Sequence, residues 1–135
     1  MGRLTRPALP VLYRSRRVRQ SALRNIAANG ASVSRDRALQ LTDDMLGCRI
    51  AADILATDEH FAPLDPAPCP ITIAWCELDR LFPEGEFGAR AQERLPGARY
   101  VVLRNVGHVP MLDDPQLVAT VIRESLGAAR TAPGS

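Results

Sequence analysis

The chain has 135 residues, a length that suits one modest domain or part of a larger one. Its composition, 46% hydrophobic and 24% charged, is ordinary for a globular protein, and no apolar run is long enough to span a membrane. Three cysteines without metal-ligand spacing argue against a disulfide scaffold or a zinc module. We therefore expect a reduced, cytoplasmic chain that needs no cofactor.

The charge of the chain is unevenly distributed, and all 17 basic residues are arginines. Residues 1–37 hold nine arginines and one acid, for a net charge of +8, whereas residues 38–135 have a net charge of −6. Such asymmetry occurs in proteins that bind nucleic acids or membranes. A run of arginines at 14–19 is more typical of a solvated helix face, so we predict neither partner.

The first part of the chain, residues 1–62, is predicted to be helical. Apolar residues at helical spacing indicate a helix from Ser15 to Asn29, with Gly30 at the place of a C-terminal cap. A short helix is also expected over residues 50–55. No strand pattern occurs in this part.

Between these two helices, Ser34 is a predicted N-cap, and the helix that follows it is expected to end at Gly47. Its shared apolar face would consist of Ala38, Leu41 and Met45. Residues 63–70 contain four prolines, which can neither continue a helix nor donate to a sheet. We predict an extended connection there, and a boundary between two parts.

The second part, residues 71–127, alternates between strand and helix. Residues 71–75 form a short apolar run that is typical of a strand buried on both faces. A helix is predicted from Pro83 to Leu95, and residues 100–103 form a second buried strand. Two strands joined by a helix are expected to be parallel neighbours with a right-handed crossover.

The last predicted helix begins at Asp114, an N-cap, with a proline at its first position. Its buried stripe is expected to be formed by Leu117, Val118, Val121, Ile122 and Leu126. Gly127 is expected to end the helix, and residues 128–135 are predicted to be a disordered tail.

Two residues with catalytic chemistry follow the two predicted strands. Asp79 lies four residues after Trp75, and His108 lies four residues after Arg104. Ligand chemistry in parallel sheets gathers beyond the carboxyl ends of the strands, which lie about 4.8 Å apart. A carboxylate at that distance can fix the tautomer of an imidazole and stabilise its protonated form. The spacing therefore predicts an acid–base pair.

Three pieces of this region resemble α/β-hydrolase-fold enzymes. Residues 75–83 read W-C-E-L-D-R-L-F-P, similar to the acid-bearing loop of these enzymes, usually W-G-x-x-D-x-x-x-P. Residues 95–99, L-P-G-A-R, are similar to the segment before their last strand, and residues 107–115, G-H-V-P-M-L-D-D-P, resemble their catalytic-histidine loop. The resemblance covers about residues 68–127.

The resemblance implies an α/β fold, namely the C-terminal part of an α/β-hydrolase fold, with residues 1–62 as a helical cap segment in front of it. It also implies that Asp79 orients His108, and that His108 is the general base. Leu81 and Val109, beside these two residues, are candidates for lining the substrate site.

The chain departs from the family pattern in two ways. Cys76 stands where the family usually has glycine, and neither G-x-S-x-G nor an HGGG-like segment occurs. We therefore expect the nucleophile to come from a missing segment. A serine would act on an ester-like small molecule, and an aspartate would act on an epoxide or a halide. A non-catalytic remnant, an interaction module and, more weakly, a nucleic-acid-binding protein are the alternatives.

The predicted strand at 71–75 would have an unpaired edge in such a half fold. Unpaired strand edges beside apolar residues promote association. The sequence therefore predicts a chain of low stability that is inactive alone, and that associates with itself or with a missing N-terminal half.

Overall fold

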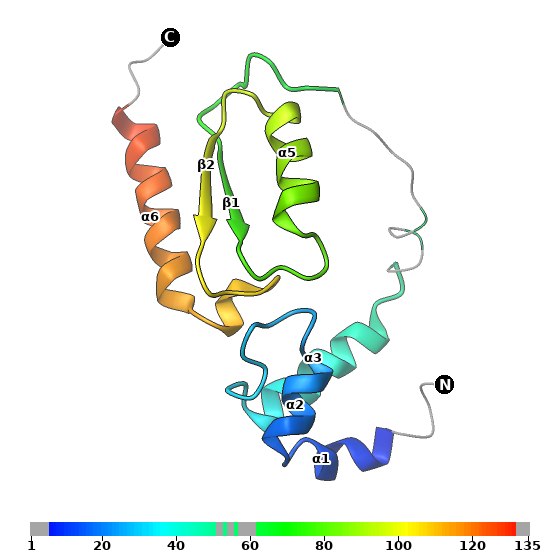
Figure 1. Cartoon of the computed structure of the whole chain (residues 1–135). Helices are drawn as coiled ribbons and strands as arrows, with labels where there is room; N and C mark the ends of the chain where they lie inside the picture. Colours follow the sequence, from blue (N-terminus) through cyan, green and yellow to red (C-terminus); the bar gives the residue numbers. More distant parts are fainter. Residues whose placement is uncertain (1–5, 51–52, 54–55, 57–61, 132–135) are drawn as a thin grey trace. The chain divides into compact units, whose positions relative to one another are not determined.

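The computed structural model describes residues 6–50, 53, 56 and 62–131 (Figure 1). These residues form two compact units. The first unit consists of the described residues up to Arg24 and of those from Asn29 to residue 56. The second unit consists of Asn25–Ala28 and of the described residues from 62 onward. A segment of four residues from the helical part of the chain thus belongs with the second unit.

The first unit is helical. Its elements are the 3-10 turn η1 (Arg6–Ala8), α1 (Leu9–Leu12), α2 (Arg16–Ala22) and α3 (Arg35–Gly47). The helix predicted from Ser15 to Asn29 is wrong in length, because α2 ends at Ala22. The helix predicted over residues 50–55 lies mostly outside the described residues.

Gly30 makes a close backbone contact in this unit and does not act as the predicted helix cap. A Cβ atom at Gly30 would lie 2.9 Å from both the Arg19 carbonyl oxygen and the Leu23 Cβ. The adjacent Ala31 is bound to the same helix, since its N–H donates to Gln20 Oε1 (3.0 Å) and its carbonyl accepts from the Arg19 guanidinium (3.2 Å). The chain therefore folds back against α2 at this glycine.

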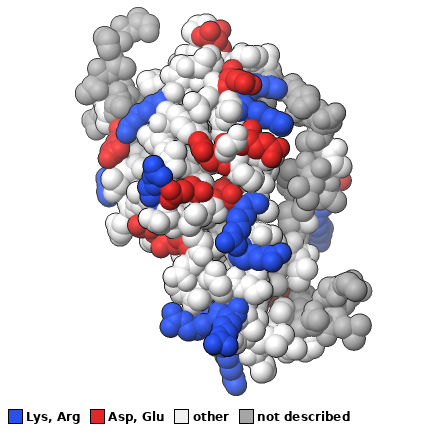
Figure 2. All heavy atoms as spheres, in the orientation of Figure 1, with Lys and Arg blue, Asp and Glu red and all other residues white. Residues whose placement is uncertain are grey.

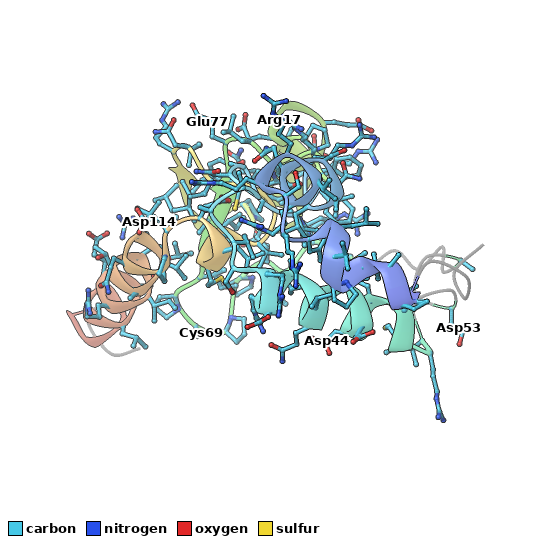
Figure 3. The ribbon with its side chains drawn as sticks, turned by 90° about the horizontal axis from the view of Figure 1, so that it is seen from below. Arg17, Asp44, Asp53, Cys69, Glu77 and Asp114 are labelled. Carbon is cyan, nitrogen blue, oxygen red and sulfur yellow. The ribbon has the colours of Figure 1, made fainter. Side chains whose placement is uncertain are left out.

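Helix α3 begins as predicted, because Ser34 Oγ accepts a hydrogen bond from the Arg37 N–H at 3.2 Å. It also ends at Gly47 as predicted. Its apolar face is buried only near the start: Ala38 is fully buried, whereas Met45 is exposed. Figure 3 shows the side chain of Asp44, also on α3, pointing outward.

The second unit contains two parallel neighbouring strands, as predicted. These are β1 (Thr72–Cys76) and β2 (Arg99–Leu103), paired so that Ala74 lies opposite Val101. The π-helical turn η2 (Glu84–Gly88) and the helix α5 (Ala89–Arg94) connect the strands. The predicted strand–helix–strand unit is therefore confirmed.

Helix α6 (Pro115–Thr131) lies on the opposite side of the sheet from α5 (Figure 1). The 3-10 turn η3 (Pro110–Leu112) precedes it. The core of the unit lies between the sheet and the first half of α6. Its members are Cys76, Leu103 and Val106, with Val101, Leu117 and Val121 packed against them.

The start of α6 is as predicted and its end is not. Asp114 Oδ1 accepts a hydrogen bond from the Leu117 N–H at 2.9 Å, which confirms the N-cap. The helix then continues past Gly127 to Thr131, so the first four residues of the predicted disordered tail, 128–131, are helical. A glycine cap requires a left-handed backbone, and none of the described glycines has a positive φ.

Burial along α6 and β1 is weaker than the sequence predicts. Ile122 and Leu126 are 54% and 63% exposed, and Ala74 of β1 is exposed too. These residues border a shallow apolar groove, the α6 groove, which is lined by Thr72, Ala74, Val121, Ile122, Ser125 and Leu126. The apolar pattern identified the right faces, but it does not determine how far another surface covers them. Within the described residues, β1 pairs only with β2.

Candidate active site at the ends of the two strands

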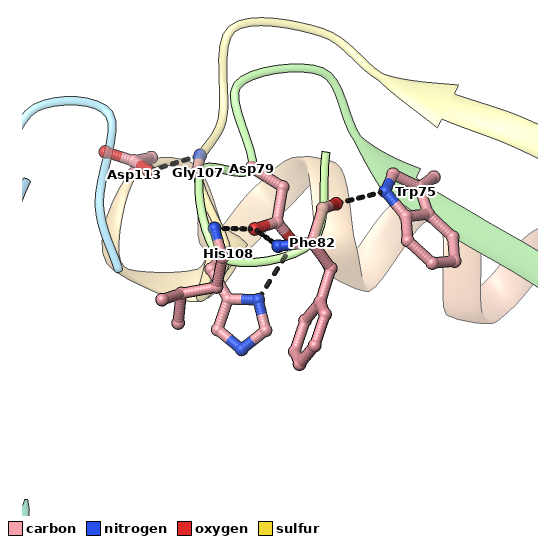
Figure 4. Close-up of polar contacts among 7 residues, drawn as sticks. Trp75, Asp79, Phe82, Gly107, His108 and Asp113 are labelled. Atoms are coloured by element: carbon pink, nitrogen blue, oxygen red, sulfur yellow. Dashed lines mark hydrogen bonds and ion pairs between the residues drawn. The ribbon is translucent and has the colours of Figure 1, made fainter. Parts of the chain in front are cut away.

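Asp79 lies in the loop after β1 and is held by the backbone of its own loop. Its Oδ1 accepts hydrogen bonds from the N–H groups of Leu81 and Phe82, both at 2.9 Å. The loop is tied back to the strand, because Trp75 Nε1 donates to the Phe82 carbonyl at 3.0 Å (Figure 4). The second carboxylate oxygen, Oδ2, is therefore directed by a rigid turn.

His108 lies in the loop after β2, and the backbone is fixed on both sides of it. The N–H of Gly107 donates to Asp113 Oδ2 at 2.9 Å, and the N–H of Val109 donates to the Ile26 carbonyl at 2.8 Å. Ile26 belongs to the segment Asn25–Ala28, which groups with this unit. The histidine loop is therefore held from two directions.

The two loops bring Asp79 and His108 together. Asp79 Oδ2 lies 2.8 Å from His108 Nδ1 (Figure 4), as their spacing after the two strands predicts. The Asp79 side chain is 8% exposed and that of His108 is 31% exposed. Because an ionised carboxylate can only accept, Nδ1 carries the proton in this hydrogen bond. In the neutral ring Nε2 is then the nitrogen that can accept a proton.

Glu77 ties the exits of the two strands together, a role that the sequence did not reveal. Its N–H donates to the Leu103 carbonyl at 2.9 Å. Its carboxylate accepts from the Asn105 N–H at 2.9 Å and pairs with the Arg104 guanidinium at 2.6 Å. The hydrogen bond from Asn105, followed by the contacts with Arg104, lowers the pKa of Glu77. Glu77 reaches the surface of the molecule (Figure 3).

An open hollow of about 250 Å³, the site hollow, adjoins the Asp79–His108 pair. It is lined by Ala74, Trp75, Cys76, Asp79, Phe82, His108 and Pro110. The Phe82 ring lies 5.4 Å from the His108 ring, centre to centre. Neither Leu81 nor Val109, the predicted lining residues, borders the hollow; Phe82 and Pro110, one residue further along the chain, do.

Cys76 is buried in this hollow, and its surroundings keep the sulfur protonated. Burial is the largest cause of its raised pKa, and the negative charges of Asp79 and Asp113 raise it further. The thiolate that a cysteine nucleophile needs is thus disfavoured. Among the residues with described positions, no group of three or more His, Cys, Asp or Glu side chains is arranged to hold a metal ion.

The arginine-rich segment lies in the first unit, apart from these loops in the sequence. On the face shown in Figure 2, arginine side chains gather over the helical unit, whereas acidic and basic side chains are mixed over the strand-bearing unit. Arg17 of α2 points outward (Figure 3). No described helix has both the length and the apolar character needed to cross a membrane.

Comparison with known proteins identifies the family. The alpha/beta hydrolase family matches residues 2–121. Over 60 residues the chain is 37% identical to the protein named Epoxide hydrolase EphH from Mycobacterium tuberculosis, and this match covers 44% of the chain and 28% of that protein. The chain therefore spans little more than a quarter of the length of this curated relative. No solved structure matches the chain.

The chain belongs to the alpha/beta hydrolase family, which confirms the resemblance seen in the sequence. Its two parallel strands and their helices form part of an α/β-hydrolase fold.

Proposed function

We propose that this member of the alpha/beta hydrolase family carries the acid and the base of a hydrolytic triad, Asp79 and His108. The observation that supports the proposal most strongly is the 2.8 Å contact between Asp79 Oδ2 and His108 Nδ1, beyond the ends of two parallel strands. In this arrangement Asp79 orients the ring and stabilises its protonated form, while Nε2 takes up protons from the reacting group.

The reaction we propose has two steps, and the nucleophile comes from outside these 135 residues. In the first step the nucleophile becomes esterified by the substrate. In the second step a water oxygen bonds to the ester carbonyl carbon while His108 Nε2 takes a proton from that water. The ester C–O bond then breaks, and the proton passes from His108 to the departing oxygen. Asp79 remains ionised throughout and stabilises the imidazolium.

The similarity to an epoxide hydrolase favours an epoxide as the substrate. An aspartate nucleophile would open the epoxide by forming one C–O bond and breaking another, and the second step would release a diol. The aromatic and apolar residues of the site hollow, Trp75, Phe82 and Pro110, suit the hydrocarbon part of such a substrate. A serine nucleophile would instead make the protein an esterase, and the same Asp79–His108 pair would serve both reactions.

We further propose the division of labour along the chain that the sequence indicates. Residues 1–62 form a helical cap-like segment, residues 63–70 connect it, and residues 71–127 form part of the hydrolase core. The nucleophile, and a strand for the free edge of β1, would then come from another segment. Without that segment the chain is inactive, because triad residues act as a unit.

The first test of this proposal measures the purified chain with styrene oxide and with p-nitrophenyl acetate, beside His108→Ala. We expect no saturable turnover from either protein. Saturable turnover that His108→Ala abolishes would show that a nucleophile lies within the 135 residues, and would contradict the proposed division.

The second test reads the DNA before the codon of Met1. An in-frame G-x-D-x-G would support the epoxide reaction, and G-x-S-x-G would support the esterase. Joined to the segment that this DNA encodes, the chain should turn over its substrate, and Asp79→Asn should lower kcat by about 10⁴-fold. Full activity of the joined protein with His108→Ala would refute the role of the pair.

A further inference from the structure

We propose that Asp113 is a positioning residue for His108, and that it works by clamping the histidine loop onto the segment Asn25–Ala28. Asp113 Oδ2 accepts two backbone hydrogen bonds at 2.9 Å, one from Gly107 and one from Ala28. Gly107 directly precedes the histidine, so the clamp acts one residue from the ring. The catalytic meaning of this clamp rests on the proposed function.

The packing around the clamp is close enough to fix the loop. Gly107 and Ala27 are both buried. A Cβ atom at Gly107 would lie 2.7 Å from the Ala28 nitrogen and 2.8 Å from the Ala27 carbonyl carbon, so only glycine fits without a shift of backbone. The backbone of the histidine loop therefore lies directly on the backbone of residues 25–28.

A second contact closes the clamp on the other side of His108. The N–H of Val109 donates to the Ile26 carbonyl at 2.8 Å. The residues before and after the histidine are thus both tied to residues 25–28, one through the Asp113 carboxylate and one directly. Fixing both flanking peptides restricts where the ring can lie, which the 2.8 Å contact with Asp79 requires.

A carboxylate suits this position because it serves two N–H donors with one oxygen. Hydrogen bonds from backbone N–H groups to an ionised carboxylate are stronger than those to a neutral acceptor. An asparagine can keep an oxygen in the same place, whereas an alanine leaves both donors without this acceptor.

The neighbouring acid provides a matched control. Asp114 has the same charge and also accepts a backbone N–H, that of Leu117, but it caps α6 and makes no described contact with the histidine loop. In the sequence the pair reads as a helix start, so Asp113 looks like part of a cap. The structure gives the two acids separate tasks.

The clamp also links the helical part of the chain to the base. Residues 25–28 lie in the sequence between α2 and α3, about 80 residues before His108, yet they group with the strand-bearing unit. A change that displaces this segment is expected to release the histidine loop, even though the segment contributes no side chain to the site hollow.

The experiment follows the His108 Nδ1–H proton by NMR in the 135-residue chain, with assignment by its loss in His108→Ala. We expect the signal in the unaltered chain and in Asp114→Ala, whose α6 is weaker but whose histidine loop is intact. Asp113→Ala should lose the signal or broaden it beyond detection. Asp113→Asn should restore it, because the amide oxygen still accepts.

A wild-type signal in a folded Asp113→Ala chain, judged by far-UV circular dichroism, would overturn the proposal. Should that variant fail to fold, amide hydrogen exchange of the unaltered chain tests the same clamp. The Ala28, Gly107 and Val109 amides should be protected and exchange at one common rate, as members of one opening unit. An Ala28 amide that exchanges as freely as an open turn would overturn it.

These outcomes are separable from those of the proposed function. The NMR signal and the exchange rates require no turnover. If the joined protein hydrolyses nothing while Asp113→Ala still removes the signal, only the proposed function fails. If hydrolysis depends on His108 while Asp113→Ala leaves the signal intact, only the clamp fails.

Discussion

The second unit contrasts two regions of the same sheet. At the carboxyl ends of the strands, residues 77–82 and 104–113, the site loops, are held by hydrogen bonds to one another and to residues 25–28. Along the flank of β1, the α6 groove presents apolar side chains to the outside, with Ile122 and Leu126 more than half exposed. The polar region is complete, and the apolar region is not.

The difference follows from the reach of the two kinds of interaction. A hydrogen bond of a site loop needs a partner a few ångströms away, and the other strand's exit supplies it. The N–H of Leu78, for example, donates to the Val106 carbonyl at 3.0 Å. An apolar stripe is stabilised only in proportion to the surface that covers it. A site can therefore be preformed on a sheet whose flank is still open.

The largest effect that we expect distinguishes the covered from the uncovered part of the apolar surface. Leu103 is 4% exposed and lies in the core, so Leu103→Ala should lower the free energy of unfolding by about 2–5 kcal/mol or abolish a cooperative transition. Leu126→Ala, in the α6 groove, should change it by no more than about 0.5 kcal/mol.

Urea unfolding followed by circular dichroism measures both variants. Equal losses from the two substitutions would show that the far half of α6 is covered in solution, for instance by a second copy of the chain. The contrast between the two regions would then be wrong.

The next effect compares two glycines. Gly107→Ala places a Cβ against the backbone of Ala27 and Ala28, so we expect a loss of about 1–3 kcal/mol from the forced shift. Gly127 lies inside α6 with open space around it, so Gly127→Ala should increase stability by about 1 kcal/mol. Opposite signs in the same unfolding assay are the expected result, and a neutral Gly107→Ala would contradict the close packing of the histidine loop.

The smallest effect concerns Glu77 and depends on pH. Its pKa is lower in the folded chain than its ordinary value, so it adds stability above that ordinary value, near 4.3, and this contribution is lost as the pH falls through the folded pKa. We expect Glu77→Gln to be less stable than the unaltered chain at pH 7 and equal to it in strong acid. Because Glu77 is exposed, salt should reduce the difference.

Unfolding curves at several pH values, with Glu93→Gln of α5 as the control, test this expectation. A pH-independent difference for Glu77→Gln would mean that its charge does not tie the strand exits together.

The sequence predicted those features that depend on near neighbours. Ser34 and Asp114 cap helices through residues three positions away, and Asp79 and His108 meet because each lies a few residues beyond one of two adjacent strands. These arrangements leave a local pattern of residue types. The family resemblance rested on the same segments.

The features that the sequence did not predict depend on contacts between distant parts of the chain. Helix α2 ends early, and the backbone of residues 25–28 instead bonds to the histidine loop about 80 residues later. Asp113 reads as a capping residue until that segment is in place. The exposure of Ile122 and Leu126 likewise depends on which surface covers them, which periodicity does not encode.

The central claim is that the acid–base pair is formed within this chain, and the protonation of the His108 ring tests it most directly. Long-range ¹H–¹⁵N spectra of the neutral imidazole identify which nitrogen carries the proton. We predict the proton on Nδ1 in the unaltered chain, held by Asp79, and its loss from that position in Asp79→Asn, whose amide no longer presents a carboxylate. A ring with its proton on Nε2 in the unaltered chain, or a spectrum that Asp79→Asn leaves unchanged, would contradict the account.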